Sequence, residues 1–520
     1  MVYSCDNVNK LKDRNVKKVF GVVMIIVFLS APVIAQTYYV ATTGSDSSDG
    51  SFDHPFATIP KGISVATVPG TTIYVRGGTY AYSTTITISR SGDSTHVYQL
   101  LAYPGERAFL DFSSMPISSS NRGIRLSGRY WHIKGFDIWR AGDNGMNLSG
   151  SNNIVEFCSF SENHDTGLQL GGGAANNRII NCDSYYNADP SQGNADGFSP
   201  KLDVGTGNYF YGCRSWQNSD DGWDGYIRPR PAVVPTTTLE NCWSFSNGYL
   251  ITGLPSTGNG NGFKMGGSDS ANLSHNMILK KCLSFRNRVK GFDQNNDRGN
   301  MTLLNCTSFS NGTNYGMNGP IGTGSVMTLK NCISAGTGAV NLLSTAVQAT
   351  NSWMSPFVVT DSDFVSIDTA GVRGPRHPDG SLPDLTFMHL APGSDLIDAG
   401  TDVGLPFNGP APDLGCFETE GSQSVGDQIL NPGPFTLKQN YPNPFNPSTE
   451  ILFSVEKTGT TTLIVCDVLG RKVATLFDGT AQVGREYRIT FDASKLVSGV
   501  YFYTLESGSR VDTRKLILLR

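Results

Sequence analysis

Three aspartates, Asp220, Asp221 and Asp224, stand close together in the segment NSDDGWDGY. A fourth, Asp196, lies upstream in NADGF, and a single lysine, Lys264, lies downstream in NGNGFKMGG. The three segments share one local pattern, in which a polar residue is followed by Gly, an aromatic residue and another polar residue. A recurring pattern of this kind indicates stacked structural repeats. Stacking would bring the four acids and the lysine into one site.

Carboxylates gathered at one point repel each other, and the repulsion raises the pKa of one or more of them. A hard divalent cation relieves it, and Ca²⁺ suits an all-aspartate cluster because it takes about six to eight oxygen ligands in flexible geometry. The sequence therefore predicts Asp196, Asp220, Asp221 and Asp224 as ligands of Ca²⁺. Aspartate pairs are also common in turns, so a plain solvated loop is the alternative interpretation.

Lys264 is predicted to be a general base. A lysine close to a bound cation and to Lys290 loses part of its preference for the charged form, so we expect a lowered pKa. The reaction that needs this pairing is β-elimination on a uronate, in which the base removes the weakly acidic C5 proton and Ca²⁺ stabilises the developing charge. For a lone lysine, an ordinary surface side chain is the alternative.

Several basic side chains near the cluster are candidates for holding the carboxylates of a substrate, because cationic groups pair well with carboxylates. These are Lys290, Arg228, Arg230, Arg286 and Arg288. Trp216, Trp223 and Tyr226 are candidates for stacking on sugar rings, although Trp223 also fits a core position.

A cysteine recurs along the middle of the chain in similar local contexts, such as VEFCSFSEN, LENCWSFSN and LLNCTSFSN. Short β-rich runs between Gly and Asn favour strands and tight turns over helix pairs, and one cysteine per repeat fits a right-handed parallel β-helix. The cysteines would form an inward column of small buried side chains, with disulfides between coils as the alternative. An asparagine follows each of the first six cysteines by five residues, and we expect these amides to hydrogen-bond along the stack. The cysteines are Cys158, Cys182, Cys213, Cys242, Cys282, Cys306 and Cys332, and the asparagines are Asn163, Asn187, Asn218, Asn247, Asn287 and Asn311.

A second landmark is a Gly followed by a bulky apolar residue, which we expect to point into the core of each coil. These apolar residues are Leu168, Phe198, Trp223, Phe263, Phe292 and Met317. The positions just before the Gly and two after it change sharply in charge from one coil to the next, so we expect both columns to face outward. In this register Asp196 lies one coil from Asp221, and Lys264 lies one coil from Asp224.

The N-terminal region begins with a three-part targeting signal over residues 1–35, in which two lysines precede a short apolar run and small residues. The apolar run is shorter than the roughly 20 residues of a spanning helix, although a retained anchor is the alternative. The β-helix domain is predicted over residues 36–420, with a capped start at 37–112, a short capping helix at 59–66 and a terminal coil at 383–418. The net charge of −4 does not favour nucleic acid as a partner, and we expect a monomer.

From about residue 435 the chain alternates apolar and polar residues over short strands, which predicts a small β-sandwich at 435–520 after a linker at 421–434. YPNPFNPST and the closing GVYFYTL resemble the C-terminal sorting domain of the type nine secretion system of Bacteroidota-like bacteria. The resemblance implies outer-membrane secretion machinery as a partner and a protein that is secreted or held at the cell surface. A carbohydrate-binding sandwich is the alternative.

Over residues 150–315, the segments NADGF, GCRSWQNSDDGWD, GNGFKMGG and KGFDQNN look like polysaccharide lyase family nine. The resemblance implies a pectate lyase-like β-helix that cleaves an acidic plant polysaccharide, with Ca²⁺ on the four aspartates and Lys264 as the base. The family also acts on rhamnogalacturonan and other uronate polymers, so the substrate stays open. Two further alternatives are an inverting glycoside hydrolase that uses Asp220 and Asp221, and a surface adhesin in which Ca²⁺ only staples the coils.

Overall fold

The computed structural model describes residues 35–228, 233–268, 273–419, 435–440, 443–481, 487–508 and 510–519. The chain divides into two compact units, Met1–Ser422 and Gln423–Arg520, and each is described by itself. The predicted signal peptide and the predicted linker fall almost entirely outside the described residues and stay predictions.

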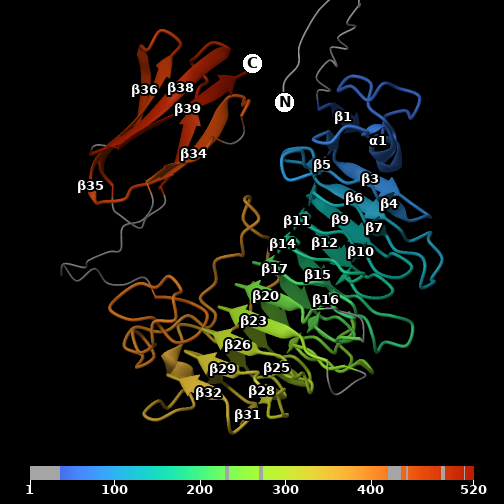
Figure 1. Cartoon of the computed structure of the whole chain (residues 1–520), viewed down its shortest axis with the longest axis vertical. Coiled ribbons are helices and arrows are strands. Elements are labelled where there is room, and N and C mark those ends of the chain that lie inside the picture. The colour runs from blue at the N-terminus through green and yellow to red at the C-terminus, as the bar shows by residue number, and fades with distance from the viewer. Residues whose placement is uncertain are drawn as a thin grey trace, which may run out of the picture. The chain divides into compact units, whose positions relative to one another are not determined.

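The first unit is the predicted parallel β-helix, in which successive coils add strands to three sheets in turn (Figure 1). The first sheet stacks β1 (Thr37–Val40), β2 (Thr72–Val75), β5 (Tyr98–Ala102), β8 (Trp131–Lys134), β11 (Ile154–Glu156), β14 (Arg178–Ile180), β17 (Asn208–Tyr211), β20 (Thr236–Glu240), β23 (Asn276–Lys280), β26 (Met301–Leu304), β29 (Met327–Lys330) and β32 (Val347–Ala349). The second sheet stacks β3 (Gly78–Ala81), β6 (Ala108–Asp111), β9 (Phe136–Trp139), β12 (Ser159–Ser161), β15 (Asp183–Tyr185), β18 (Arg214–Trp216), β21 (Trp243–Phe245), β24 (Leu283–Phe285), β27 (Thr307–Phe309) and β30 (Ile333–Ala335). The third sheet stacks β4 (Ile86–Ile88), β7 (Ile124–Leu126), β10 (Met146–Leu148), β13 (Leu168–Leu170), β16 (Phe198–Pro200), β19 (Trp223–Asp224), β22 (Phe263–Lys264), β25 (Lys290–Asp293), β28 (Thr313–Met317) and β31 (Ala339–Leu342).

Two of the predicted columns are confirmed. The seven cysteines are buried and, within the described part of the chain, none forms a disulfide. The asparagines form a continuous hydrogen-bonded ladder, in which each amide Nδ2 donates to Oδ1 of the next coil, as in Asn218 to Asn247 and Asn247 to Asn287, both at 3.0 Å. The ladder satisfies buried polar groups at the turn between the second and third sheets, so it holds the start of every third-sheet strand.

The aromatic ladder of the third sheet is confirmed from Leu168 to Phe292, and its rings stack at centroid distances of 4.9 to 5.2 Å. The prediction of Met317 as its sixth member is wrong. Phe292 pairs with Tyr315 instead, because the register of β25 with β28 places Gly316 opposite Asp293, two residues from the expected alignment of Gly316 with Gly291. Met317 is buried at another position of the core.

The start of the β-helix carries the predicted capping helix, α1 (Ile59–Val65). Thr58 caps it by accepting a hydrogen bond from the Lys61 N–H, and Pro60 stands in its first turn, where a missing N–H costs nothing. Ile59 and Ile63 join the core of the first coils, so the helix covers apolar residues at the end of the stack.

The predicted terminal coil at 383–418 is wrong, because this segment contains no strand. With the short 3₁₀ helix η1 (Asp361–Asp363), the chain after β32 instead folds back over the second sheet. Phe387 packs on Phe285 and Phe309, and Phe417 packs on Trp243. The second sheet has large apolar side chains on its outer face, and their burial from water accounts for this cover.

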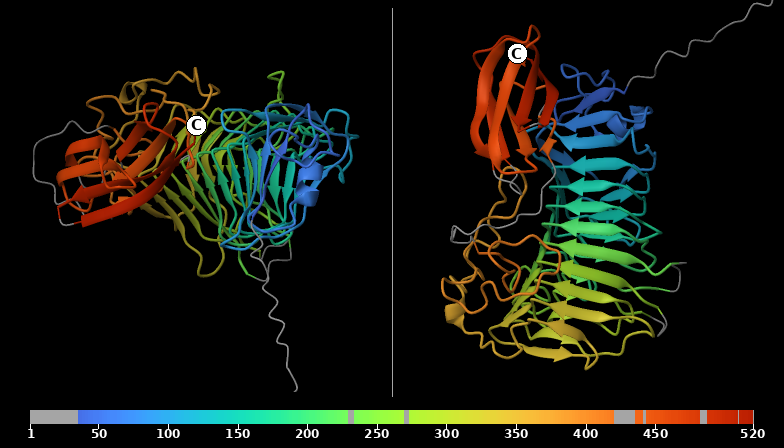
Figure 2. Two further views of the ribbon diagram at one scale, coloured as in Figure 1. Left: turned by 90° about the horizontal axis from the view of Figure 1, so that it is seen from above. Right: turned by 60° about the vertical axis from the view of Figure 1, so that its left-hand side comes forward.

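The second unit is the predicted β-sandwich, built of two antiparallel sheets around one core. One sheet contains β33 (Thr436–Leu437), β34 (Ser448–Ser454) and β37 (Tyr487–Asp492), and the other contains β35 (Gly459–Asp467), β36 (Lys472–Ala481), β38 (Gly499–Ser507) and β39 (Arg510–Leu518). Ile451 and Phe453 from the first sheet share a core with Leu463, Val465 and Tyr503 from the second. Figure 2 shows the strands of both units from two further sides. Among the described residues, no helix is both long and apolar enough to cross a membrane.

Candidate active site

Four neighbouring strands of the third sheet, β16, β19, β22 and β25, position the predicted site. In each strand an aromatic residue points into the core, so the next residue points to the other face. Asp224 pairs with Lys264 in the β19–β22 register, and Lys264 pairs with Asp293 in the β22–β25 register. The predicted one-coil spacing of Asp224 and Lys264 is confirmed.

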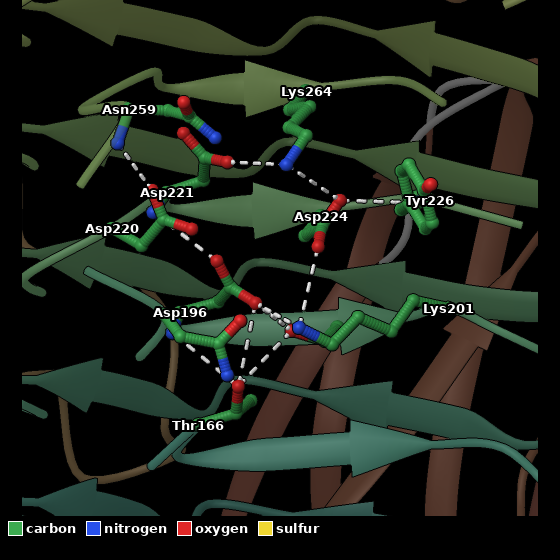
Figure 3. A network of polar contacts seen from close by, with 12 residues as sticks. Thr166, Asp196, Lys201, Asp220, Asp221, Asp224, Tyr226, Asn259 and Lys264 are labelled. Atoms are coloured by element: carbon green, nitrogen blue, oxygen red, sulfur yellow. Dashed lines mark hydrogen bonds and ion pairs between the residues drawn. The ribbon is translucent and has the colours of Figure 1, made fainter. Parts of the chain in front are cut away.

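Three of the four predicted ligands form one compact group. Carboxylate oxygens of Asp196, Asp220 and Asp221 lie within 4.8 Å of one another, and all three side chains are buried. The backbone orients them: the Asp221 N–H donates to Asp196 Oδ1 at 3.2 Å, and the Asn261 N–H donates to Asp221 Oδ1 at 2.8 Å. The Asn259 N–H donates to Asp220 Oδ1. The arrangement is seen in Figure 3.

The column two residues after the Gly points away from the core, as expected, but the carboxylates of both columns have almost no exposed surface. Asp196 and Asp221 are fully buried, and Asp224 is 4% exposed. Neighbouring coils cover each other's side chains, and residues 256–259 cover the group further, with Ser256 Oγ donating to the Ser219 carbonyl. The acids therefore form an enclosed cluster rather than a solvated loop.

The electrostatics of the group fit a divalent cation. Burial raises the pKa of Asp220, and repulsion from Asp221 and Asp196 raises it further. Burial and repulsion from Asp196 and Asp224 also raise the pKa of Asp221 above its usual value, although Lys264 opposes the shift. A bound cation would offset the repulsion between these buried carboxylates and so favour their ionised forms. Clustered oxygen donors without nitrogen or sulfur suit Ca²⁺.

Lys264 lies beside the three-carboxylate group and contacts two aspartates. Its Nζ is 3.1 Å from Asp221 Oδ2 and 3.4 Å from Asp224 Oδ1, with the side chain 8% exposed. Among the protein groups alone, burial lowers the pKa of Lys264, but the charges of Asp221 and Asp224 raise it by more. Lys290 does not oppose them, because its Nζ pairs with Asp293 Oδ1 at 2.7 Å. The expected lowering beside a bound cation stays a prediction.

The fourth predicted ligand, Asp224, faces two lysines. Lys264 is one, and the other is Lys201, whose Nζ is 3.3 Å from Asp224 Oδ2 and 2.6 Å from Asp196 Oδ2. Burial raises the pKa of Asp224, but the two ammonium groups lower it by more, so this acid stays ionised. The sequence interpretation missed Lys201. The alternation of side-chain direction along FSPK could have indicated it, because Phe198 points inward and Lys201 then falls on the same face as Ser199.

The predicted substrate-binding residues are scattered. The Arg288 guanidinium donates to the Gly258 carbonyl, in the loop that covers Asp220, and Lys290 lies one coil beyond Lys264. Arg286 instead donates to Thr369 at 2.7 Å, in the segment that covers the second sheet. Arg228 is exposed just after the site strand, and Arg230 lies outside the described residues.

Of the three aromatic candidates, only Tyr226 lies at the site with a partly solvent-exposed side chain. The Lys264 ammonium lies 5.9 Å from the centre of its ring. Trp223 is fully buried in the core ladder. Trp216 is stacked between Tyr185 and Phe245 of the second sheet.

Comparisons with known proteins agree with this fold. Residues 38–333 match the family described as Pel9A-like, right handed beta helix region. Pectate lyase L of Dickeya chrysanthemi is 40% identical over 74% of this chain and 90% of its own length. The crystal structure of pectate lyase Pel9A superposes with a TM-score of 0.68 at 38% identity, covering 74% of this chain and 96% of that one. A rhamnogalacturonan lyase superposes with a TM-score of 0.57 at 26% identity, covering 69% and 97%.

Residues 439–519 match a secretion system C-terminal sorting domain. This match confirms the sorting domain predicted from YPNPFNPST, and a protein that carries such a domain is secreted or displayed at the cell surface. The larger domain carries the chemistry. From the family match over residues 38–333, the chain belongs to the Pel9A-like family of right-handed β-helix proteins, and it is a polysaccharide lyase.

Proposed function

We propose that this protein is a Ca²⁺-dependent pectate lyase, which cleaves polygalacturonan by β-elimination with Lys264 as the base. The observation that carries the proposal is the position of Lys264, whose ammonium lies 3.1 Å from Asp221 at the edge of a buried three-carboxylate group. A hydrolase that used only Asp220 and Asp221 would leave this lysine without a role.

Asp196, Asp220 and Asp221 would hold the cation, with Asp224 as the fourth carboxylate beside them. When bound, Ca²⁺ would supply positive charge that stabilises the charge developing on the uronate and offsets the aspartate charges that raise the pKa of Lys264. All four aspartates are almost fully buried and held by backbone or ammonium donors, so little reorganisation is needed at the moment of reaction.

Lys264 takes the C5 proton, and the electron pair that remains forms the double bond as the C4–O4 bond to the leaving sugar breaks. The base must be neutral to accept this proton. Its two partners in the metal-free arrangement, Asp221 and Asp224, stabilise the charged form, so deprotonation requires that their charge be offset. This requirement links the activity to the cation.

Substrate recognition would use the basic residues around the site. We propose Lys290 and Arg288, which lie near the cluster, as groups that hold further uronate carboxylates, together with Arg228, which follows β19. Arg230, two positions later in the sequence and outside the described residues, stays a candidate for the same role. Arg286 contacts Thr369 on the side of the second sheet, so it would bind only a substrate chain that extends to that side. The 40% identical relative named pectate lyase L supports pectate as the substrate, while the rhamnogalacturonan lyase structure supports rhamnogalacturonan as the second candidate.

The sorting domain at 439–519 supports a further assignment. We propose that outer-membrane secretion machinery recognises this domain, that residues 1–35 direct the first export step, and that the β-helix domain then works as a monomer outside the cell.

The test is a panel of polygalacturonan, rhamnogalacturonan and a neutral polysaccharide, with product absorbance in the ultraviolet as the measurement. We expect an unsaturated product from polygalacturonan, which disappears with a chelator and returns with added Ca²⁺. Lys264→Ala should lower kcat by about 10² to 10⁴, the range of a lost general base. A saturated product would instead indicate hydrolysis, and a fully active Lys264→Ala variant would exclude the mechanism.

A further inference from the structure

We propose that Lys201 is a positioning residue of this active site: its ammonium group sets the orientation of Asp196 and Asp224, and through Asp224 the position of Lys264. This inference deepens the proposed function and rests on it. Lys201 follows β16 on the third sheet and is 7% exposed, so it is part of the enclosed cluster.

The first contact fixes the plane of the Asp196 carboxylate, so that one of its two oxygens faces the other acids. Asp196 Oδ2 receives three donors: Lys201 Nζ at 2.6 Å, Ser199 Oγ at 2.7 Å and Thr166 Oγ1 at 3.3 Å. Among the described residues, Asp196 Oδ1 accepts a hydrogen bond only from the Asp221 N–H, at 3.2 Å. A turn of the carboxylate out of this plane would break the short ion pair with Lys201, so the pair keeps one carboxylate oxygen of Asp196 facing Asp220 and Asp221.

The second contact makes Asp224 a bridge between two ammonium groups. Lys201 Nζ lies 3.3 Å from Oδ2, and Lys264 Nζ lies 3.4 Å from Oδ1. The Tyr226 N–H also donates to Oδ1 at 3.0 Å. Because Lys201 pairs with one oxygen of Asp224, the other oxygen faces Lys264. This contact holds Lys264, the proposed base, at the edge of the three-carboxylate group.

The charge balance of the cluster favours a resident ammonium over a group that binds substrate. Four carboxylates against two ammonium groups leave two negative charges, which one divalent cation would balance. Lys201 has its ammonium between two buried aspartates and has little free surface. A substrate carboxylate would have to displace one of these partners to reach it.

The test is Lys201→Met in the full chain, which keeps the length of the side chain and removes its charge. Partners that orient groups at a metal site typically cost about 10- to 100-fold in activity when they are lost. We expect kcat on polygalacturonan to fall by that factor at Ca²⁺ concentrations that calorimetry shows to be saturating, with KM within about threefold of wild type. Lys201→Arg, which keeps the positive charge, should recover part of the loss.

The matched control is Lys134→Met, which removes a lysine paired with Glu156 at 2.8 Å on the first sheet, away from the site. It should leave kcat unchanged. If Lys201→Met does not fold, as judged by circular dichroism, Lys201→Arg and Lys201→Gln carry the test with the same measurements. A kcat within about twofold of wild type, or one that returns fully when more Ca²⁺ is added, would overturn the inference.

Lys264→Ala measured alongside separates the two proposals. If Lys264→Ala is inactive while Lys201→Met is fully active, only the positioning role fails. If Lys264→Ala is fully active, the proposed mechanism itself fails.

Discussion

Replacement of Asn247 by Ala tests whether the asparagine ladder supports the site. Asn247 is fully buried, and its Oδ1 accepts from Asn218 Nδ2 at 3.0 Å and from the Asn218 N–H at 3.2 Å. Its Nδ2 donates to Asn287 Oδ1 at 3.0 Å and to Ser244 Oγ at 3.1 Å. Asn218 begins the turn that leads to Asp220, so the ladder holds the chain on which the acids stand.

The expected loss follows from what the substitution leaves behind. Asn218 Nδ2 keeps Ser215 Oγ at 2.9 Å, but the Asn218 N–H loses its side-chain acceptor in the buried turn. An orphaned buried donor costs about 1–3 kcal/mol, and each further lost hydrogen bond costs about 1 kcal/mol. The free energy of unfolding of the β-helix unit should therefore fall by about 4–6 kcal/mol in Asn247→Ala.

Tryptophan fluorescence during denaturant unfolding measures this loss, because all six tryptophans lie in the β-helix unit and none in the C-terminal unit. The matched control is Asn300→Ala, which removes an exposed asparagine whose Nδ2 donates to Asn276 at 3.1 Å. It should cost less than about 1 kcal/mol, as exposed substitutions usually do. Equal losses in the two variants would refute the reasoning that the buried ladder is a main support.

Two further predictions concern the cation and pH. Ca²⁺ should raise the melting temperature of the wild-type β-helix by mass action, and Asp221→Asn should lose most of that rise. The control Asp384→Asn, at a side chain 95% exposed, should keep it. Calorimetric scans with and without Ca²⁺ measure the rise, and an unchanged rise in Asp221→Asn would exclude Asp221 as a ligand. Away from the site, burial raises the pKa of Glu156, but His132 and Lys134 lower it by more, to about 2 from 4.5. Because the folded-state pKa is depressed, this stabilisation is present above pH 4.5 and is lost as the pH falls toward 2. The difference in unfolding free energy between wild type and Glu156→Gln should shrink over that window, and a difference that stays constant would show that ionisation of Glu156 contributes nothing.

Much of the fold was predictable because a β-helix repeats the same pattern of strands and turns from coil to coil. The central coils repeat a cysteine, an asparagine and, in most of them, an aromatic residue, and parallel stacking places equivalent positions above one another. The register of Asp224 with Lys264 followed from this rule alone. The rule failed at Tyr315, which lies opposite Phe292 in place of Met317, because a two-residue difference in register keeps side chains on the same face and leaves the apolar pattern of this coil unchanged.

The covering segment at the end of the first unit was not predictable from local pattern. Residues 383–418 have the turn-rich composition of a coil, but they contain no strand and bury apolar side chains of the second sheet. This outcome depends on contacts between residues more than a hundred positions apart, such as Phe387 with Phe285. Local propensity does not encode which surface a loop will cover.

The sequence by itself determined the chemistry that is available, namely four aspartates and one lysine in adjacent repeats, and the order in which stacking arranges them. The tertiary structure alone decided how they divide. Asp196, Asp220 and Asp221 form the carboxylate group, while Asp224 is held between Lys264 and a second lysine, Lys201. The reason is that side-chain direction and burial, rather than spacing along the chain, set which charges come within ion-pair distance. In an enclosed, low-dielectric cluster those distances determine which groups stay charged.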